Sequence, residues 1–172
     1  MPLIKAGAIV ADPWVSVEDG APLPTDGPVI VSLARFQAER EELLARGEPL
    51  GLRLKPAEKP AQIGEDVKTF ALVALEFPTF RDGRGYSHAR ILRERLGFRG
   101  EIRAVGDVLR DQFLFMHRCG IDAFEVADEA ALAGWLAAME ELSVFYQAAA
   151  DGAPDVISRR HRRNAAYFDS GI

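Results

Sequence analysis

Residues 70–77 read FALVALEF, a nearly unbroken apolar run. A run without polar alternation is typical of a central strand covered on both faces of a parallel sheet. Shorter apolar runs occur at residues 29–33, 50–54, 101–105 and 122–126, and stretches with helical spacing separate them. This alternation predicts an α/β fold with a mainly parallel sheet of about five strands.

The helices are expected between these strands. They are predicted over residues 33–45, with Ser32 as N-cap, over 87–96, from Asp107 to Gly120 and over 128–150, with a charged connection or short helix at 60–67. Five strands are too few for a complete eight-fold barrel. We therefore expect an open sheet, or a half-barrel that pairs with another chain.

The chain divides into three parts by composition. Residues 1–27 are rich in proline and glycine and predict an N-terminal hairpin or arm, with strand-like pieces only at 5–10 and 14–17. Residues 28–150 carry the strand and helix pattern and form the predicted α/β domain. Residues 151–172 are basic and then aromatic, which favours a docking tail.

Bulk composition excludes several classes of protein. The net charge of −5 argues against general nucleic-acid binding, and no apolar run approaches the ~20 residues that cross a bilayer. No secretion signal is evident at the N-terminus, so we expect a cytoplasmic protein. The single cysteine, Cys119, and three scattered histidines predict no metal site. The chain has no siroheme, iron–sulfur or dinucleotide motif, so the sequence does not identify a cofactor.

A basic segment is the most distinctive local feature. Residues 81–110 hold eight of the seventeen arginines and four acidic residues, a local charge of +4. The glycine-punctuated loop at 82–87, DGRGYS, leads into a helix, and ligands of parallel sheets gather at such strand ends. The guanidinium fork suits sulfite, sulfate, phosphate or carboxylate. The candidate anion-binding residues are Arg81, Asp82, Gly83, Arg84, Ser87 and Arg103.

Simpler interpretations of this segment remain open. The DGRG sequence is compatible with a surface turn whose arginines form ion pairs, or with a subunit interface. The helical arginines 90, 93 and 95 are expected to be solvated. Glu76 is a candidate acid/base or the acceptor of an arginine, and Asp107 is a candidate acid/base or a helix cap.

The stretch from Glu76 to Val126 carries the motif FPxFxDGRGxS followed by LRxRLGxxGExRAxGDVxxDQ. It resembles a bacterial family known as domain of unknown function 934, whose members are commonly labelled oxidoreductases of sulfite reduction. The resemblance implies a role in assimilatory sulfur metabolism, and it brings no catalytic assignment. The family pattern falls on Phe77, Asp82, Gly83, Arg84, Ser87, Arg103, Gly106, Asp107, Asp111 and Gln112.

Three functions are compatible with these observations. The first is an accessory protein of assimilatory sulfite reduction, which binds sulfite reductase or another sulfur-assimilation protein, and an oxyanion at the loops after the third and fourth strands. The second is a small metabolic enzyme, such as an oxidoreductase, acting on an anionic sulfur-containing or phosphorylated substrate. In it Arg84 and Arg103 clamp the anion and Glu76 or Asp107 is the acid/base. The third is a structural half-barrel that forms a homo-oligomer.

Overall fold

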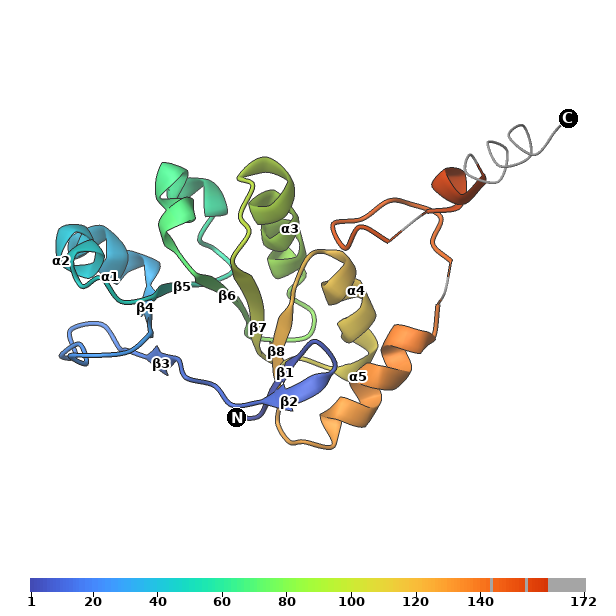
Figure 1. Cartoon of the computed structure of the whole chain (residues 1–172), viewed down its shortest axis with the longest axis horizontal. Helices are drawn as coiled ribbons and strands as arrows, with labels where there is room; N and C mark the ends of the chain where they lie inside the picture. The colour runs from blue at the N-terminus through green and yellow to red at the C-terminus, as the bar shows by residue number, and fades with distance from the viewer. Residues whose placement is uncertain (143, 154, 161–172) are drawn as a thin grey trace, which may run out of the picture.

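The computed structural model describes residues 1–142, 144–153 and 155–160. Its centre is one curled sheet in the order β2-β1-β8-β7-β6-β5-β4-β3 (Figure 1). The five predicted strands are confirmed and run parallel to one another. They are β4 (Val29–Ser32), β5 (Leu50–Leu54), β6 (Leu72–Phe77), β7 (Glu101–Gly106) and β8 (Ala123–Glu125).

The sheet has eight strands, so the expected number of five was wrong. The N-terminal arm supplies the other three: β1 (Leu3–Lys5), β2 (Ala8–Val10) and β3 (Val15–Ser16). Strands β1 and β2 form a hairpin that turns inside the strand-like piece expected at 5–10, and β1 pairs antiparallel with β8. Strand β3 pairs parallel with β4 at the opposite edge. The arm was underestimated because strands of two or three residues between prolines and glycines give almost no alternating pattern.

The helices follow the predicted order with changed bounds. The helix expected over 33–45 is split at Glu39, and Ser32 caps its first half as predicted by accepting a hydrogen bond from the Arg35 amide. The helix expected from residue 87 begins at Arg84. The α-helices are α1 (Leu33–Ala38), α2 (Arg40–Ala45), α3 (Arg84–Arg90), α4 (Phe113–Arg118) and α5 (Ala131–Glu140). Short 3-10 turns cover Pro60–Gln62, Gly64–Thr69 and Arg110–Gln112, and a π-helical turn covers Ile91–Arg95.

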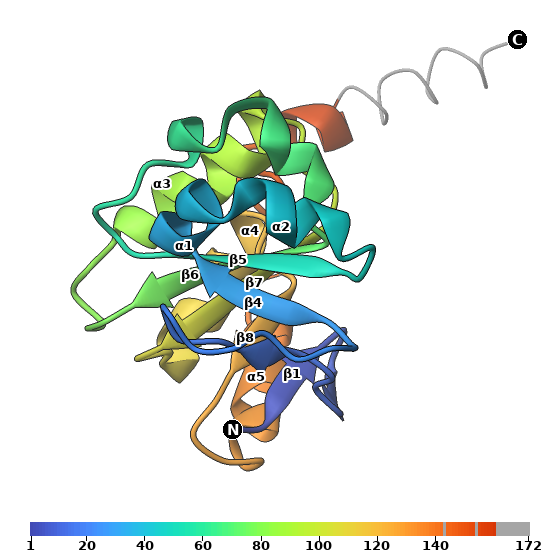
Figure 2. The same ribbon diagram turned by 90° about the vertical axis from the view of Figure 1, so that its left-hand side faces the viewer.

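The two faces of the sheet are covered differently. Helices α1 to α4 pack on one face of β4–β7 (Figure 2), and the part of the N-terminal arm around Trp14 packs on the other face. In β7, Ile102 and Ala104 belong to the helix-side core, so Glu101, Arg103 and Val105 face the arm. On the arm side Trp14 packs on a small apolar cluster made of Ile30, Leu72, Ala74 and Val105.

The arm therefore crosses the inner face of the half-barrel. Strands β2 and β3 lie at opposite edges of the sheet, and residues 11–14 connect them (Figure 1). Within the described ranges no helix combines the length and apolar character needed to cross a membrane. The predicted tail at 151–172 lies partly outside the described residues, which end at residue 160.

Candidate functional site

The DGRG loop connects β6 to α3 and is built around one ion pair. The Arg84 Nε and Nη2 atoms donate to the two carboxylate oxygens of Asp82 at 2.9 and 2.6 Å, and the Arg84 amide donates to Asp82 at 3.2 Å. The Arg84 guanidinium lowers the pKa of Asp82 to about 2. Asp82 is thus the carboxylate partner of Arg84, as the ion-pair interpretation of this loop requires.

The other residues of the loop surround this pair. The Arg81 guanidinium lies over the Phe80 ring, 5.5 Å from its centroid, and no ion pair holds it within the described part of the chain. Gly83 is the N-cap of α3, and Ser87 lies beside Arg90 on the same helix, in a cleft between α3 and the 147–149 segment. The loop therefore presents Arg81 and Arg84 on the surface.

Arg103 lies apart from this loop, in the middle of β7 and on the arm side of the sheet. It is 1% exposed and donates to both Asp12 oxygens at 2.6 and 3.1 Å and to Glu101 at 2.9 Å. Glu125 lies 3.7 Å away. Burial would lower the pKa of Arg103, but its bonds with Asp12 and Glu101 outweigh burial and raise that pKa. Arg103 therefore anchors the arm across the half-barrel, and the structure does not bring it together with Arg81 and Arg84.

Asp107 supports the DGRG loop from the neighbouring strand. Its carboxylate accepts from the Phe80 amide at 2.9 Å. Gln112 donates to the Phe80 carbonyl oxygen at 3.0 Å and accepts from the Leu109 amide at 3.2 Å. The prediction that Asp107 caps the next helix was wrong. Gln112 accepts from the first backbone amide of that turn, and the Asp107 carboxylate accepts from the loop after β6 instead.

Gly106 allows the two loops to approach. Its φ is +103°, and a Cβ at this position would overlap the Phe77 carbonyl group. The Asp107 amide donates to the same Phe77 carbonyl oxygen at 2.7 Å. The loop after β6 is therefore shaped by residues of the loop after β7. These residues also belong to the family pattern named above: Gly106, Asp107 and Gln112.

Glu76 lies at the end of β6 on the arm side, in a cleft of about 240 Å³. It accepts from Arg53 of β5 at 3.0 Å, so its arginine partner comes from outside the basic segment. Lys55 also lines this cleft. Sequence reasoning missed Arg53 and Lys55, although the alternation in LGLRLK at 50–55 places Arg53 on the face opposite the core leucines.

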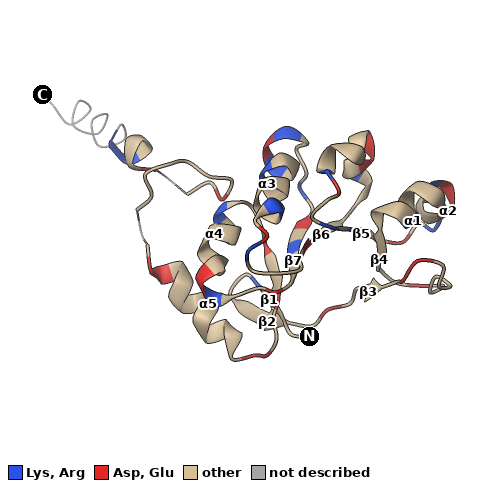
Figure 3. Ribbon diagram, turned by 180° about the vertical axis from the view of Figure 1, so that it is seen from behind, with Lys and Arg blue, Asp and Glu red and all other residues tan. Residues whose placement is uncertain are grey.

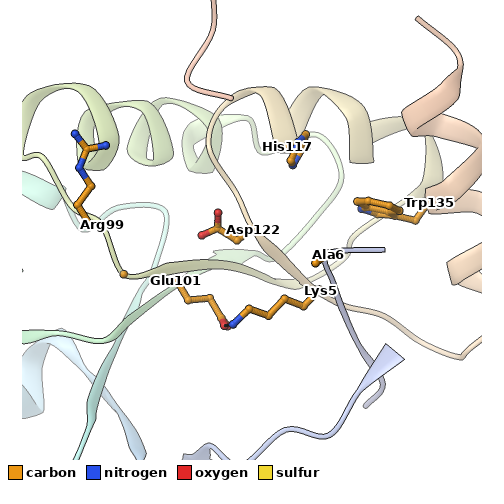
Figure 4. A pocket seen from close by; sticks show the side chains of 8 residues that line it. Lys5, Ala6, Arg99, Glu101, His117, Asp122 and Trp135 are labelled. Carbon is orange, nitrogen blue, oxygen red and sulfur yellow. Dashed lines mark hydrogen bonds and ion pairs between the residues drawn. The ribbon is translucent and has the colours of Figure 1, made fainter. Parts of the chain in front are cut away.

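A second cleft of about 440 Å³ opens at the other end of the strands (Figure 4). Its two carboxylates are engaged: Glu101 pairs with Lys5 at 2.6 Å, and Asp122 pairs with Arg93 and accepts from the Ile102 amide at 2.8 Å. Around them lie Ala6, Arg99, Gly100, His117 and Trp135. These contacts join the hairpin to β7 and the π-helical turn to the start of β8, and they explain the cleft as part of the packing.

The arginines after the loop do not form one basic face. Arg90 pairs with Glu94 on the surface as expected. The prediction of a solvated Arg93 was wrong, because its side chain is 13% exposed and donates to the carbonyl oxygens of Phe98, Gly100 and Gly120. Figure 3 shows basic and acidic ribbon segments interleaved around α3. Within the described residues, no group of three or more His, Cys, Asp or Glu side chains is placed to hold a metal ion.

The segment after α5 is held on α4 by Arg118. This guanidinium pairs with Asp151 at 3.1 Å, donates to the Gln147 carbonyl oxygen at 2.7 Å and lies 3.6 Å from the centroid of the Phe145 ring. A bridge between Phe145 and Asp155 then brings the 144–146 and 155–157 stretches side by side. Six large apolar side chains nevertheless stay exposed on and after α5: Leu136, Leu142, Val144, Tyr146, Val156 and Ile157.

A comparison with curated proteins gave no match. A comparison with protein families matched residues 51–156 to the bacterial proteins of unknown function called DUF934. The matched range runs from β5 through the DGRG loop to the segment held by Arg118, and it covers more than half of the chain. The chain therefore belongs to the DUF934 family.

Proposed function

We propose that this protein is an accessory protein of assimilatory sulfite reduction that binds a protein partner through its C-terminal apolar surface. We define that surface by the six exposed side chains Leu136, Leu142, Val144, Tyr146, Val156 and Ile157. The sulfur-assimilation context rests on the resemblance described above. The observation that carries partner binding is the exposure of these side chains, five of which lie on the segment after α5 that Arg118 anchors.

The exposure is concentrated in one region. Within the described residues eleven large hydrophobic residues are exposed, and six of them fall within positions 136–157, where Tyr146 is 76% exposed. Contiguous exposed apolar surface on a soluble protein is typical of an interaction site, and tyrosine is enriched in such interfaces. The bridge from Phe145 to Asp155 brings the backbones of the two stretches that carry Val144, Tyr146, Val156 and Ile157 side by side.

The anchoring by Arg118 supports the same proposal. Its side chain is 12% exposed and that of Asp151 is 6% exposed, so their ion pair is largely shielded from water. A surface whose backbone is already positioned loses less conformational entropy on binding. The segment thus presents apolar side chains in a fixed arrangement, which suits a docking surface.

The oxyanion part of the proposal now rests on the loop after β6. Arg103 is occupied by the arm, so Arg81 and Arg84 are the arginines left to bind an anion there. An anion has to share Arg84 with Asp82, which predicts weak binding. Sulfate should raise the melting temperature of the parent protein, and the rise should shrink in Arg84→Ala but persist in Arg90→Ala. Equal stabilisation of parent and Arg84→Ala would remove the oxyanion from the proposal.

One observation supports the alternative that the protein is a small metabolic enzyme. Glu76 lies in a cleft at the carboxyl ends of parallel strands, where active sites of related architectures are found. Asp107 does not share that cleft, because it is bonded to the Phe80 amide. In this alternative Glu76 alone is the acid/base candidate, and Arg53 replaces Arg103 as the nearest guanidinium.

Co-purification tests the accessory function. The full-length protein is co-expressed with the sulfite reductase of the same genome, and the complex is measured by native mass spectrometry. We expect a complex with the parent and its loss in Tyr146→Ser with Ile157→Ser. The control is Val15→Ser, which removes a 49% exposed apolar side chain from the far edge of the sheet. No complex with the parent, or equal loss in the control, would contradict the proposal.

A further inference from the structure

The cleft at the carboxyl ends of β4, β5 and β6 has a chemistry that neither the partner surface nor the DGRG loop uses. It lies on the inner face of the half-barrel, opposite the helices, and one of its walls is the arm segment Ser16–Asp19. The other wall carries Ser32, Arg53, Lys55 and Glu76 from the three strand ends. Parallel sheets place ligands at this end of their strands.

The arm wall of the cleft is held in a defined position. Arg35 is 6% exposed and donates to the carbonyl oxygens of Glu18 and Ala21, both at 2.7 Å, and to Glu39 at 2.8 Å. Ser32 donates to the Asp19 carboxylate at 2.5 Å. The wall is thus fixed by a buried guanidinium beneath it, which is the support that a preorganised binding site needs.

The cleft has unused donors on its strand wall and unused acceptors on both walls. Only the Nη2 atom of Arg53 is engaged, and it donates to one oxygen of Glu76. Lys55 has no ion pair in the described part of the chain. Among the carboxylates, Asp19 accepts one bond from Ser32 and Glu76 accepts one from Arg53, so each keeps a free oxygen. The cations come from β5 and its end, and the carboxylates of the other wall, Glu18 and Asp19, come from the arm.

The charge balance limits the ligand class. Two cations, Arg53 and Lys55, face three carboxylates, Glu18, Asp19 and Glu76, so the lining carries a net charge of −1. A simple oxyanion would meet excess negative charge, and a simple cation would leave Arg53 and Lys55 unused. A molecule with one anionic and one cationic group satisfies both sides, and about 240 Å³ accommodates a molecule of amino-acid size.

From these contacts we propose that the cleft binds a small zwitterionic metabolite of the amino-acid type. Its carboxylate is held by Arg53 and Lys55, and its ammonium group is held by Asp19 and Glu76. This site is separate from the C-terminal apolar surface and from the DGRG loop. The test of amino-acid binding to the cleft is therefore independent of the test of the accessory function.

Titrations of the full-length protein followed by NMR test the site. The probes are glycine, L-alanine and L-serine, with acetate and methylammonium as matched half-molecules. We expect the amide resonances of Ser32, Arg53 and Glu76 to move with at least one amino acid. Acetate and methylammonium should each bind at least about tenfold more weakly than that amino acid. This corresponds to a loss of about 1.4 kcal/mol in binding free energy.

Two variants assign the binding to the cleft. Lys55→Met should weaken amino-acid binding about tenfold. The matched control is Lys68→Met, whose side chain is 73% exposed outside the cleft and should leave binding unchanged. The proposal is overturned if no amino acid moves the cleft resonances, if acetate binds as tightly as the amino acids, or if Lys55→Met binds like the parent.

Discussion

Replacing Arg103 with methionine tests the strongest structural assignment, that this arginine anchors the arm inside the half-barrel. The guanidinium is 1% exposed, and it holds Asp12 and Glu101, whose side chains are 26% and 11% exposed. Breaking a buried ion pair by removing one partner costs about 3–5 kcal/mol. Because Asp12 and Glu101 keep some access to water, we expect a loss near the lower limit, about 3 kcal/mol. For a chain of this size that loss lowers the melting temperature by about 6–12 °C.

Urea and thermal unfolding of the two proteins at neutral pH measure this loss. The matched control is Arg90→Met, which breaks a pair whose side chains are 54% and 44% exposed and should cost less than about 1 kcal/mol. A loss no larger than that of Arg90→Met would refute the anchoring role, and Arg103 would again be available for a ligand.

Three further predictions concern the loop after β6 and the C-terminal segment. Gly106→Ala should cost about 1–3 kcal/mol in urea unfolding, because φ is +103° and the added Cβ would overlap a neighbouring carbonyl group. Gly20→Ala, with φ +79° and open space around its Cβ, should cost less; equal losses would argue against the overlap. Arg84→Ala should raise the pKa of Asp82 from about 2 towards 3.8, followed by NMR of the carboxyl carbon. The pKa of Asp82 in the folded protein lies below the usual value, so the Asp82–Arg84 pair stabilises the parent above about pH 4, and this stabilisation is lost as the pH falls towards 2. An unchanged pKa of Asp82 in Arg84→Ala would show that another group lowers it. Arg118→Met should accelerate hydrogen exchange in the segment it anchors by about tenfold, while exchange in the sheet stays the same. Unchanged exchange in that segment would mean that other contacts hold it.

The parallel core of the fold could be predicted because its strands carry strong signals. The run FALVALEF contains β6, and the shorter runs contain β4, β5, β8 and all of β7 except Gly106. Strands β1 to β3 could not be counted in this way, because each has two or three residues and depends on pairing with β8 or β4. Their stability comes from the neighbouring strands, which no local pattern reports.

The helix expected over 128–150 was too long for a related reason. Its apolar spacing continues past Glu140, where α5 ends, but the following residues include Val144, Phe145 and Tyr146. β-branched and aromatic residues have lower helix propensity. Here Phe145 instead packs under Arg118, a tertiary contact that the helical pattern could not indicate.

The candidate site was predicted only in part. The loops after β6 and β7 were expected at neighbouring strand ends, because adjacent parallel strands end at the same edge, but the bond from the Phe80 amide to Asp107 was not predicted. Arg103 was grouped with them by sequence distance, although alternation along β7 places it with Glu101 on the arm side. Arg93 was assigned to solvent by α-helical periodicity, which does not hold through the π-helical turn at Ile91–Arg95.

The central claim is that a protein partner docks on the C-terminal apolar surface, and hydrogen exchange of the complex with sulfite reductase tests it most directly. We expect protection from exchange within residues 136–157 on complex formation, with little change at the DGRG loop. Tyr146→Ser with Ile157→Ser should abolish that protection. Protection confined to the DGRG loop or to the β2 edge, with residues 136–157 exchanging as in the free protein, would contradict the claim.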